Sequence, residues 1–151
     1  VGSNEALLAA FPTTNYADNA GYFRARSHYK LGDWAQAAAQ FDGLVADFPA
    51  SVYADNAIYY GGRSFYEAGR AGGAIAGVTA DYQTAIARFD QLVATYPTSV
   101  YADNGLYYAV RAFLALGDCA GANARVGALQ AMTPPSTYAP KAAAAAQNDG
   151  C

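Results

Sequence analysis

A nine-residue segment, FPASVYADN at residues 48–56, sets the period of the whole chain. It recurs as YPTSVYADN at residues 96–104 and as FPTTNYADN at residues 11–19, and a degenerate copy, TPPSTYAPK, covers residues 133–141. Successive copies start 37, 48 and 37 residues apart. Self-similarity at a period of roughly 20 to 50 residues is typical of repeat proteins. The sequence therefore predicts a stack of similar units.

Each unit predicts two helices. In the second unit, Ser51 is placed to cap a first helix, and Gly69 supplies its left-handed stop. Gly32 and Gly117 mark the same turn in the other units. The second helix of this unit, residues 82–94, carries apolar residues at helical spacing along one side, so we expect that side to be buried.

The longer middle spacing indicates an 11-residue insertion, which we place at residues 71–81. We therefore expect a single domain. Its parts are a partial second helix at 1–11, a first repeat at 12–48, a second repeat at 49–96 with the insertion, a third repeat at 97–133 and a terminal single helix at 134–151.

Small and large residues follow a fixed spacing within the units, which in the second unit falls on Ile58, Gly62, Phe65, Gly69, Ala85, Phe89 and Pro97. This spacing resembles the tetratricopeptide repeat (TPR). The resemblance implies an all-α fold, a right-handed TPR-like solenoid of antiparallel helix pairs, with about seven helices plus a partial N-terminal helix. The units are longer than the usual 34 residues, and the extra length lies in the Tyr-Ala-Asp-Asn lead. This variant is most similar to repeats of bacterial envelope proteins of the Tol-Pal coordinator and outer-membrane assembly lipoprotein type.

The composition excludes several classes of protein. Apolar residues make up 54 % of the chain, charged residues 14 %, and 37 residues are alanine, whereas disordered chains combine low hydropathy with high charge. A net charge of -3 argues against a nucleic-acid partner, which favours a basic face. No apolar run reaches the roughly 18 to 20 residues of a membrane span. No leader sequence opens the chain, so we expect that an export signal was removed or never existed.

The sequence predicts no catalytic, metal or cofactor site. The single histidine, His28, stands where the other units have Phe65 and Phe113, which indicates a partly buried ring that replaces an aromatic side chain. A general base or metal ligand needs partners, and no cysteine or carboxylate cluster supplies them. The glycine pairs match no phosphate-binding fingerprint. We therefore expect a protein that is not an enzyme.

Two cysteines indicate the cellular compartment. Cys119 opens the second helix of the third unit and Cys151 follows the last helix, and in an antiparallel stack these ends lie on the same side. We therefore expect a disulfide, which implies the periplasm or the cell exterior, with two buried thiols as the alternative. Hydroxyl residues near the prolines cap helices or carry O-linked glycan: Thr13, Thr14, Thr98, Ser99, Ser136 and Thr137.

Polar residues recur in register on the first helix of each unit. TPR arrays present these helices on their concave side, and residues three or four apart share a face. The resemblance therefore implies a partner-binding groove in which Asn holds a peptide backbone, Arg grips carboxylates and Tyr offers contact area. Duplication alone would also repeat these residues, and Asp18, Asp55 and Asp103 could simply neutralise the arginines. The groove residues are Asn19, Tyr22, Arg26, Tyr29, Asn56, Tyr59, Arg63, Tyr66, Asn104, Tyr107 and Arg111.

Two functions follow, and both are non-enzymatic protein–protein scaffolds in the periplasm or outside the cell. The first is a structural subunit that assembles with itself head to tail into an extracellular filament, since solenoids normally end in polar caps and both ends here are apolar. The alternative is a periplasmic TPR adaptor that binds a peptide or helix of a partner protein in the concave groove. The apolar ends favour the first, and their residues are Leu7, Leu8, Phe11, Tyr138, Ala142 and Ala145.

Overall fold

The computed structural model describes residue 6 and residues 16–151, and every regular element in residues 16–151 is a helix. The expected all-α fold is therefore confirmed. The predicted helix at 1–11, with Leu7, Leu8 and Phe11, lies outside the described residues. The helices are α2 (Ala17–Leu31), α3 (Trp34–Asp47), α4 (Ala54–Arg70), α5 (Val78–Thr95), α6 (Ala102–Ala115), α7 (Cys119–Ala131) and α8 (Ala139–Asn148).

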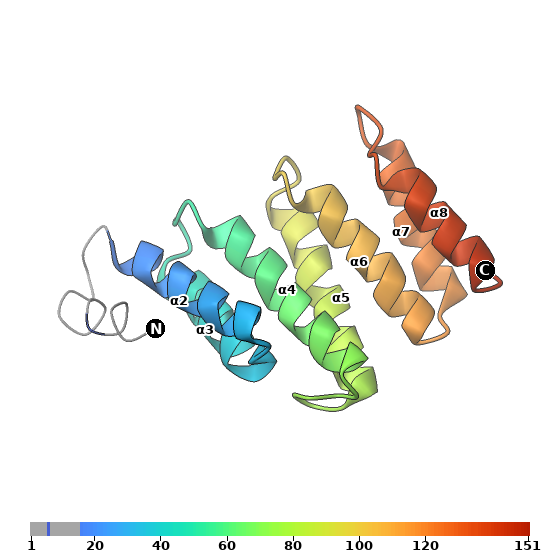
Figure 1. The fold of residues 1–151 in the computed structure, drawn as a ribbon. Helices are drawn as coiled ribbons and strands as arrows, with labels where there is room; N and C mark the ends of the chain where they lie inside the picture. The colour runs from blue at the N-terminus through green and yellow to red at the C-terminus, as the bar shows by residue number, and fades with distance from the viewer. Residues whose placement is uncertain (1–5, 7–15) are drawn as a thin grey trace.

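The helices form two rows. Figure 1 shows the first helices of the units, α2, α4, α6 and α8, in front, with α3, α5 and α7 behind them. Each helix packs against the next one in the chain, and each front helix also packs against the next front helix. No such close approach links α3 to α5 or α5 to α7. Because neighbours lie closer together on the inner side of a curved stack, the front row is the concave side.

Glycines let neighbouring helices approach closely. A methyl group at Gly62 of α4 would lie 2.8 Å from the Phe89 ring of α5, and one at Gly105 of α6 would lie 3.1 Å from Leu92. Phe89 and Leu92 are fully buried, together with Ala85 on the same side of α5. The apolar stripe that the sequence predicts for this helix is therefore part of the core that joins α4, α5 and α6.

Two of the three predicted glycine stops are confirmed. Gly32 and Gly117 have left-handed backbone, with φ of 77° and 72°. Gly69 lies instead inside α4, where a methyl group would be 3.1 Å from the Tyr82 ring. Gly69 is thus a close-packing residue, and the inserted chain that follows makes the turn. The left-handed residues of that turn are Gly72, Gly73 and Gly77.

The predicted insertion at 71–81 divides into a loop and a helical turn. Residues 71–77 form the loop, and residues 78–81 add a first turn to α5. Asp81 is fully buried and accepts hydrogen bonds from the backbone N–H groups of Ile75 at 3.2 Å and Ala76 at 2.9 Å. One carboxylate thus satisfies two loop donors, which holds the loop against α5.

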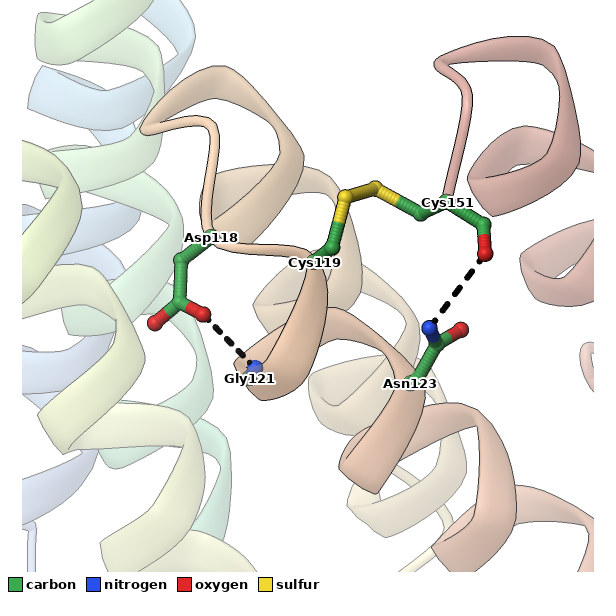
Figure 2. Close-up of a disulfide and its surroundings, with 5 residues drawn as sticks. All are labelled: Asp118, Cys119, Gly121, Asn123 and Cys151. Atoms are coloured by element: carbon green, nitrogen blue, oxygen red, sulfur yellow. Dashed lines mark hydrogen bonds between the residues drawn. A yellow bond between two sulfur atoms is a disulfide. The ribbon is translucent and has the colours of Figure 1, made fainter.

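The C-terminal helix is tied to the stack by the predicted disulfide. Cys119 is the first residue of α7, Cys151 follows α8, and their Cα atoms are 5.2 Å apart. Figure 2 shows the bond between the two helix ends, with the Asn123 side chain donating a hydrogen bond to the Cys151 carbonyl oxygen at 3.5 Å. The structure confirms the disulfide and contradicts the alternative of two buried thiols.

Candidate functional site

The repeated segment forms a clamp between successive units. The Ser51 hydroxyl donates a hydrogen bond to the Asp18 carboxylate at 2.6 Å, and its oxygen accepts one from the Tyr53 N–H at 3.1 Å. The same arrangement recurs at the two later junctions. We call these contacts the Ser–Asp clamps, and their members are Ser51 with Asp18, Ser99 with Asp55 and Ser136 with Asp103.

The clamps correct two expectations. Ser51 does not cap α4, because Tyr53 is at the N-cap and Ser51 holds the preceding loop. The clamp aspartates do not neutralise arginines; each accepts a hydrogen bond from a serine and one from the N–H of the asparagine after it. The clamp serines are also occupied. O-linked glycan stays an untested prediction for the exposed Thr98 and Thr137, and for Thr13 and Thr14, which lie outside the described residues.

The predicted groove asparagines and tyrosines belong to the same junctions. The Tyr22 ring stacks on Tyr53 of the next unit with centroids 4.7 Å apart, and the Tyr53 hydroxyl accepts a hydrogen bond from Asn19 Nδ2 at 3.0 Å. Tyr59 stacks on Tyr101 in the same way at 4.8 Å. The Asn56 side chain donates a hydrogen bond to the Tyr101 hydroxyl at 3.5 Å, and Tyr107 packs against Tyr138 with its ring tilted by 35°. Within residues 16–151, the Asn104 side chain makes no corresponding hydrogen bond. The residues that do make these contacts therefore recur because the junctions between units use them.

Three of the five predicted groove tyrosines are too buried to offer contact area. Tyr22, Tyr59 and Tyr66 expose only 6 %, 3 % and 4 % of their surface. Burial raises the pKa of each of these hydroxyls, which therefore stay neutral. This corrects the expectation that their rings face a partner, and the reason is that adjacent front helices pack closely enough to enclose them. Tyr29 and Tyr107 remain partly exposed.

The groove arginines lie against tyrosine rings of the following unit. The Arg26 guanidinium carbon is 3.7 Å from the Tyr60 ring centroid, and that of Arg63 is 3.8 Å from the Tyr108 centroid. A cation over an aromatic face is attracted by the ring quadrupole. Each ring therefore holds a guanidinium group in a defined orientation on the concave side.

Arg111 ends this row and differs from the other two. The repeat places Ala145 of α8 where Tyr60 and Tyr108 stand in the earlier units, so no ring of the next helix covers Arg111. Its side chain is exposed and donates a hydrogen bond to the Tyr107 hydroxyl at 3.1 Å. One hydrogen bond thus holds the Arg111 guanidinium group, which is otherwise exposed to solvent.

Carboxylates compensate only part of this row. Arg63 forms an ion pair with Glu67 at 2.9 Å, and Glu67 also pairs with Arg70. The Arg63 Nε atom is buried without a hydrogen-bond partner among the described residues. Within residues 16–151, neither Arg26 nor Arg111 has a carboxylate at ion-pair distance. Arg26 and Arg111 are therefore the two arginines of this row whose charge no carboxylate of residues 16–151 compensates.

Positive charge is concentrated on the front row. Seven of the nine lysines and arginines lie on α2, α4, α6 and α8, and Glu67 is the one carboxylate of these helices beyond their first turns. In the back row both arginines are paired, Arg88 with Asp42 at 2.8 Å and Arg125 with Asp90. In a chain of net charge -3, the front row thus carries more positive than negative side chains. We call the solvent-facing side of α2, α4 and α6 the first-helix face.

The residues predicted to form the C-terminal assembly end are partly used within the molecule. Tyr138 packs against Tyr107, with ring centroids 5.3 Å apart, and Ala142 is fully buried. Ala145 is partly buried. This corrects the expectation of a free apolar end, because the disulfide and the third clamp hold α8 in the stack. The outer side of α8 exposes Lys141 and Ala144 instead.

His28 agrees with its interpretation as a substitute for an aromatic side chain. Its ring exposes 17 % of its surface and its Nδ1 atom is 3.0 Å from Asp33 Oδ2. Across residue 6 and residues 16–151, no group of three or more His, Cys, Asp or Glu side chains is arranged to hold a metal ion.

Sequence reasoning missed the Ser–Asp clamps and the back-row ion pairs. The sequence does contain a signal for the clamps, which is a second periodicity. The clamp partners lie 33, 44 and 33 residues apart, and these separations follow the lengths of the units. A donor and an acceptor that recur at a separation which follows the length of the unit point to contacts between repeats. Recurrence of one residue type by itself does not distinguish such a contact from a binding surface.

Comparison with known proteins assigns the family. The sequence model of the family described as YfiO, outer membrane lipoprotein, matches residues 3–105, roughly two thirds of the chain. No curated protein matches the chain. Among the helices described, none has both the length and the hydropathy needed to cross a bilayer. The matched stretch includes both complete helix pairs of the first two units and the start of α6. The chain therefore belongs to the YfiO family of outer membrane lipoproteins.

Proposed function

We propose that the protein is a non-enzymatic adaptor in the periplasm that holds an acidic segment of another envelope protein on its first-helix face. The family match supports a role in the envelope. The observation that carries the proposal is the pair of arginines, Arg26 and Arg111, that lie on this face without a carboxylate partner in residues 16–151.

The surroundings of these arginines suit them to bind carboxylates. Tyr60 and Tyr107 already hold the two guanidinium groups, so less side-chain entropy is lost on binding. A guanidinium group can donate two parallel hydrogen bonds to one carboxylate. The charge of the face also speeds the approach of an acidic segment, an effect that salt weakens. The revised groove residues are Arg26, Tyr29, Arg63, Asn104, Tyr107 and Arg111.

Site-specific photo-crosslinking tests the proposal. A photoreactive amino acid at Ala115, which is exposed one turn after Arg111, reports on the first-helix face. The same substitution at Ala87, exposed on α5 in the back row, is the matched control. We expect adducts with an envelope protein from Ala115 and fewer from Ala87, and an acidic stretch at the crosslinked site of the partner.

Charge variants then identify the residues responsible. Arg26→Ala/Arg111→Ala should abolish the adduct from Ala115 and leave the fold intact. Arg88→Ala/Arg125→Ala removes the same charge from the back row and should leave the adduct in place. Adducts only from Ala87, or equal loss with both double variants, would show that the first-helix face is not the binding surface.

Self-assembly is a second candidate, and the observation in its favour is the position of α8. This helix is a first helix, and its outer side is exposed at Lys141 and Ala144. Residues 4–11 have the pattern of a second helix, since NEALLAAF aligns with FDGLVADF at residues 41–48. Against it, α8 carries Lys141 and Ala144 where the other units carry the asparagine and tyrosine of the junction. The family match does not bear on self-assembly.

Light scattering and electron microscopy distinguish the two candidates. An adaptor is expected to remain monomeric at high concentration, and a strict monomer would eliminate the filament. Fibres that form from the purified protein, and that are lost when residues 1–11 are deleted, would instead support head-to-tail assembly.

A further inference from the structure

A groove opens between the second and third helix pairs, at the edge where the loops lead into α6 and α8. It has a volume of about 950 Å³. Figure 1 shows these two loops along the upper side of the molecule. We call it the loop-edge groove, and the residues that matter for its chemistry are Val93, Pro97, Leu106, Met132, Thr133 and Pro134.

The preceding junction shows which side chain this groove lacks. There, Tyr96 packs against the core that contains Ile58, and its hydroxyl donates a hydrogen bond to the Pro49 carbonyl oxygen at 3.4 Å. The repeat aligns Tyr96 with Thr133 and Pro49 with Pro97. Thr133 has no ring, and the Pro97 carbonyl accepts no corresponding hydrogen bond from residues 16–151.

The walls of the two junctions are otherwise alike. Val93 and Leu106 in the loop-edge groove correspond to Val45 and Ile58, which pack in the same core as Tyr96. Val93 thus takes the place of Val45, and Leu106 takes the place of Ile58. The walls of both junctions are therefore apolar. The loop-edge groove is therefore lined as a socket for an aromatic ring, although its own chain supplies no ring.

We propose that the loop-edge groove binds an aromatic side chain, tyrosine in particular, from a segment of another protein. The ring packs against Val93 and Leu106, and a tyrosine hydroxyl donates to the Pro97 carbonyl oxygen. Met132 on the wall adds a thioether, which contacts ring edges favourably. The groove has one charged lining residue, Asp103, and Ser136 already occupies that carboxylate, so an aromatic group fits better than an ion.

This surface is separate from the first-helix face. It lies at the ends of α5, α6 and α7 and shares no residue with the arginine row. The proposal therefore does not rest on the proposed adaptor function, and either one can fail without the other. If both hold, a partner reaches from the concave side around the loop edge and inserts one aromatic residue.

Titration with a short peptide tests the groove directly. The probe is the chain's own segment 94–99 with blocked ends, acetyl-ATYPTS-amide, added to the full protein. Methyl NMR signals of Val93, Leu106 and Met132 should shift saturably, with a dissociation constant on the order of 1 mM, as expected for one anchor residue. Replacing the tyrosine of the probe with alanine should weaken binding by roughly tenfold or more.

Variants of the protein distinguish the groove from non-specific binding. Thr133→Tyr supplies the missing ring, so it should raise the melting temperature and abolish binding of the probe. Thr133→Ser keeps a short hydroxyl side chain and should leave binding unchanged. Val93→Gln places a polar group in the wall and should weaken binding even if Thr133→Tyr does not fold. Arg26→Ala/Arg111→Ala should have no effect on the probe.

Three results would overturn the proposal. The first is the absence of methyl shifts at millimolar probe. The second is equal binding by the tyrosine and alanine probes, or by the protein and its Thr133→Tyr variant. The third is a concentration-dependent shift of the same methyl signals without probe that Phe11→Ala removes, because a second copy of this chain would then be the occupant.

Discussion

The front and back rows of the stack use arginine in opposite ways. In the back row, Arg88 and Arg125 each form an ion pair with an aspartate of the preceding unit, and these pairs join neighbouring units. In the front row, Arg26 and Arg111 lie on or beside tyrosines and have no carboxylate partner in residues 16–151. Both back-row arginines therefore join neighbouring units, whereas in the front row Arg63 and Arg70 pair with Glu67 inside one helix and Arg26 and Arg111 have no such pair among the described residues.

The difference follows from the curvature of the stack. Back-row helices lie further apart, so a long arginine can span the gap between them and meet a carboxylate. Front-row helices lie closer, so the tyrosines between them become buried and the arginines are left above the rings. The role of a repeated residue can therefore be assigned only when two things are known: which row of helices carries it, and how deeply its side chain is buried. The predictions below test this contrast, beginning with the core that both rows share.

The largest effect is expected for Phe89, which is fully buried between the two rows. Phe89→Ala leaves a cavity and should lower the free energy of unfolding by roughly 3–5 kcal/mol. Urea unfolding followed by circular dichroism measures the change. Val52→Ala, at a side chain that is 81 % exposed, should change it by less than about 0.5 kcal/mol. Similar losses for the two variants would contradict the assignment of the core.

The next largest effect is expected at α8, the last helix of the front row. Cys119→Ser/Cys151→Ser removes a crosslink between residues 32 apart in sequence and should cost about 3 kcal/mol. Amide exchange should become faster in α8 than in α4, because α4 is enclosed on both sides. Unchanged protection of α8 in the double variant would show that packing alone holds this helix.

A smaller loss is expected from one Ser–Asp clamp. Asp55→Ala removes the acceptor of the Ser99 hydroxyl and of the Asn56 N–H, so the free energy of unfolding should fall by about 1–2 kcal/mol. Asp47→Ala, at an exposed position of α3, is the matched control in the back row. If the two variants are equally stable, the clamps do not stabilise the junctions.

Alkaline pH should weaken the front row selectively. Burial raises the pKa of Tyr22, Tyr59 and Tyr66 in the folded state, so these groups add stability below the unfolded pKa of about 10, and that stability is lost as pH rises through the higher folded pKa. Urea midpoints measured across this range should therefore fall. Tyr59→Phe should reduce the dependence, whereas Tyr16→Phe, at an exposed ring, should not.

The smallest effects separate the two kinds of arginine. Arg88→Ala breaks a partly exposed ion pair and should cost up to about 1 kcal/mol, since such pairs contribute little. Arg111→Ala removes an exposed side chain with one hydrogen bond and should cost less than about 0.5 kcal/mol. Matched thermal unfolding of both variants makes the comparison. A larger loss for Arg111 would mean that the front-row arginines are structural as well.

The sequence predicted the fold well, because its period and its helix-pair pattern are properties of local spacing. It also predicted the Cys119–Cys151 disulfide and the turns at Gly32 and Gly117, which depend on the ends of helices within one unit. It failed for Gly69 and for the depth of Tyr22, Tyr59 and Tyr66. Helical spacing fixes which side of a helix a residue occupies, whereas burial depends on how closely the next unit packs.

The predicted C-terminal assembly end shows the same limit of prediction from sequence. Tyr138 and Ala142 are apolar residues near the end of the chain, and in sequence they resemble an exposed surface. In the structure the third junction and the disulfide draw α8 into the stack, so Ala142 is fully buried. The burial of Tyr138 and Ala142 depends on contacts between neighbouring units. The sequence pattern of a single unit does not show these contacts.

Crosslinking from Ala115 and Ala87, compared in charge-matched variants, tests the central claim most directly. If the first-helix face binds an acidic partner segment, Ala115 gives an adduct that Arg26→Glu/Arg111→Glu eliminates and that Arg88→Glu/Arg125→Glu leaves at comparable yield in folded protein. An adduct from Ala115 that survives Arg26→Glu/Arg111→Glu, or one formed from Ala87 alone, would contradict the assignment of the free arginines to partner binding.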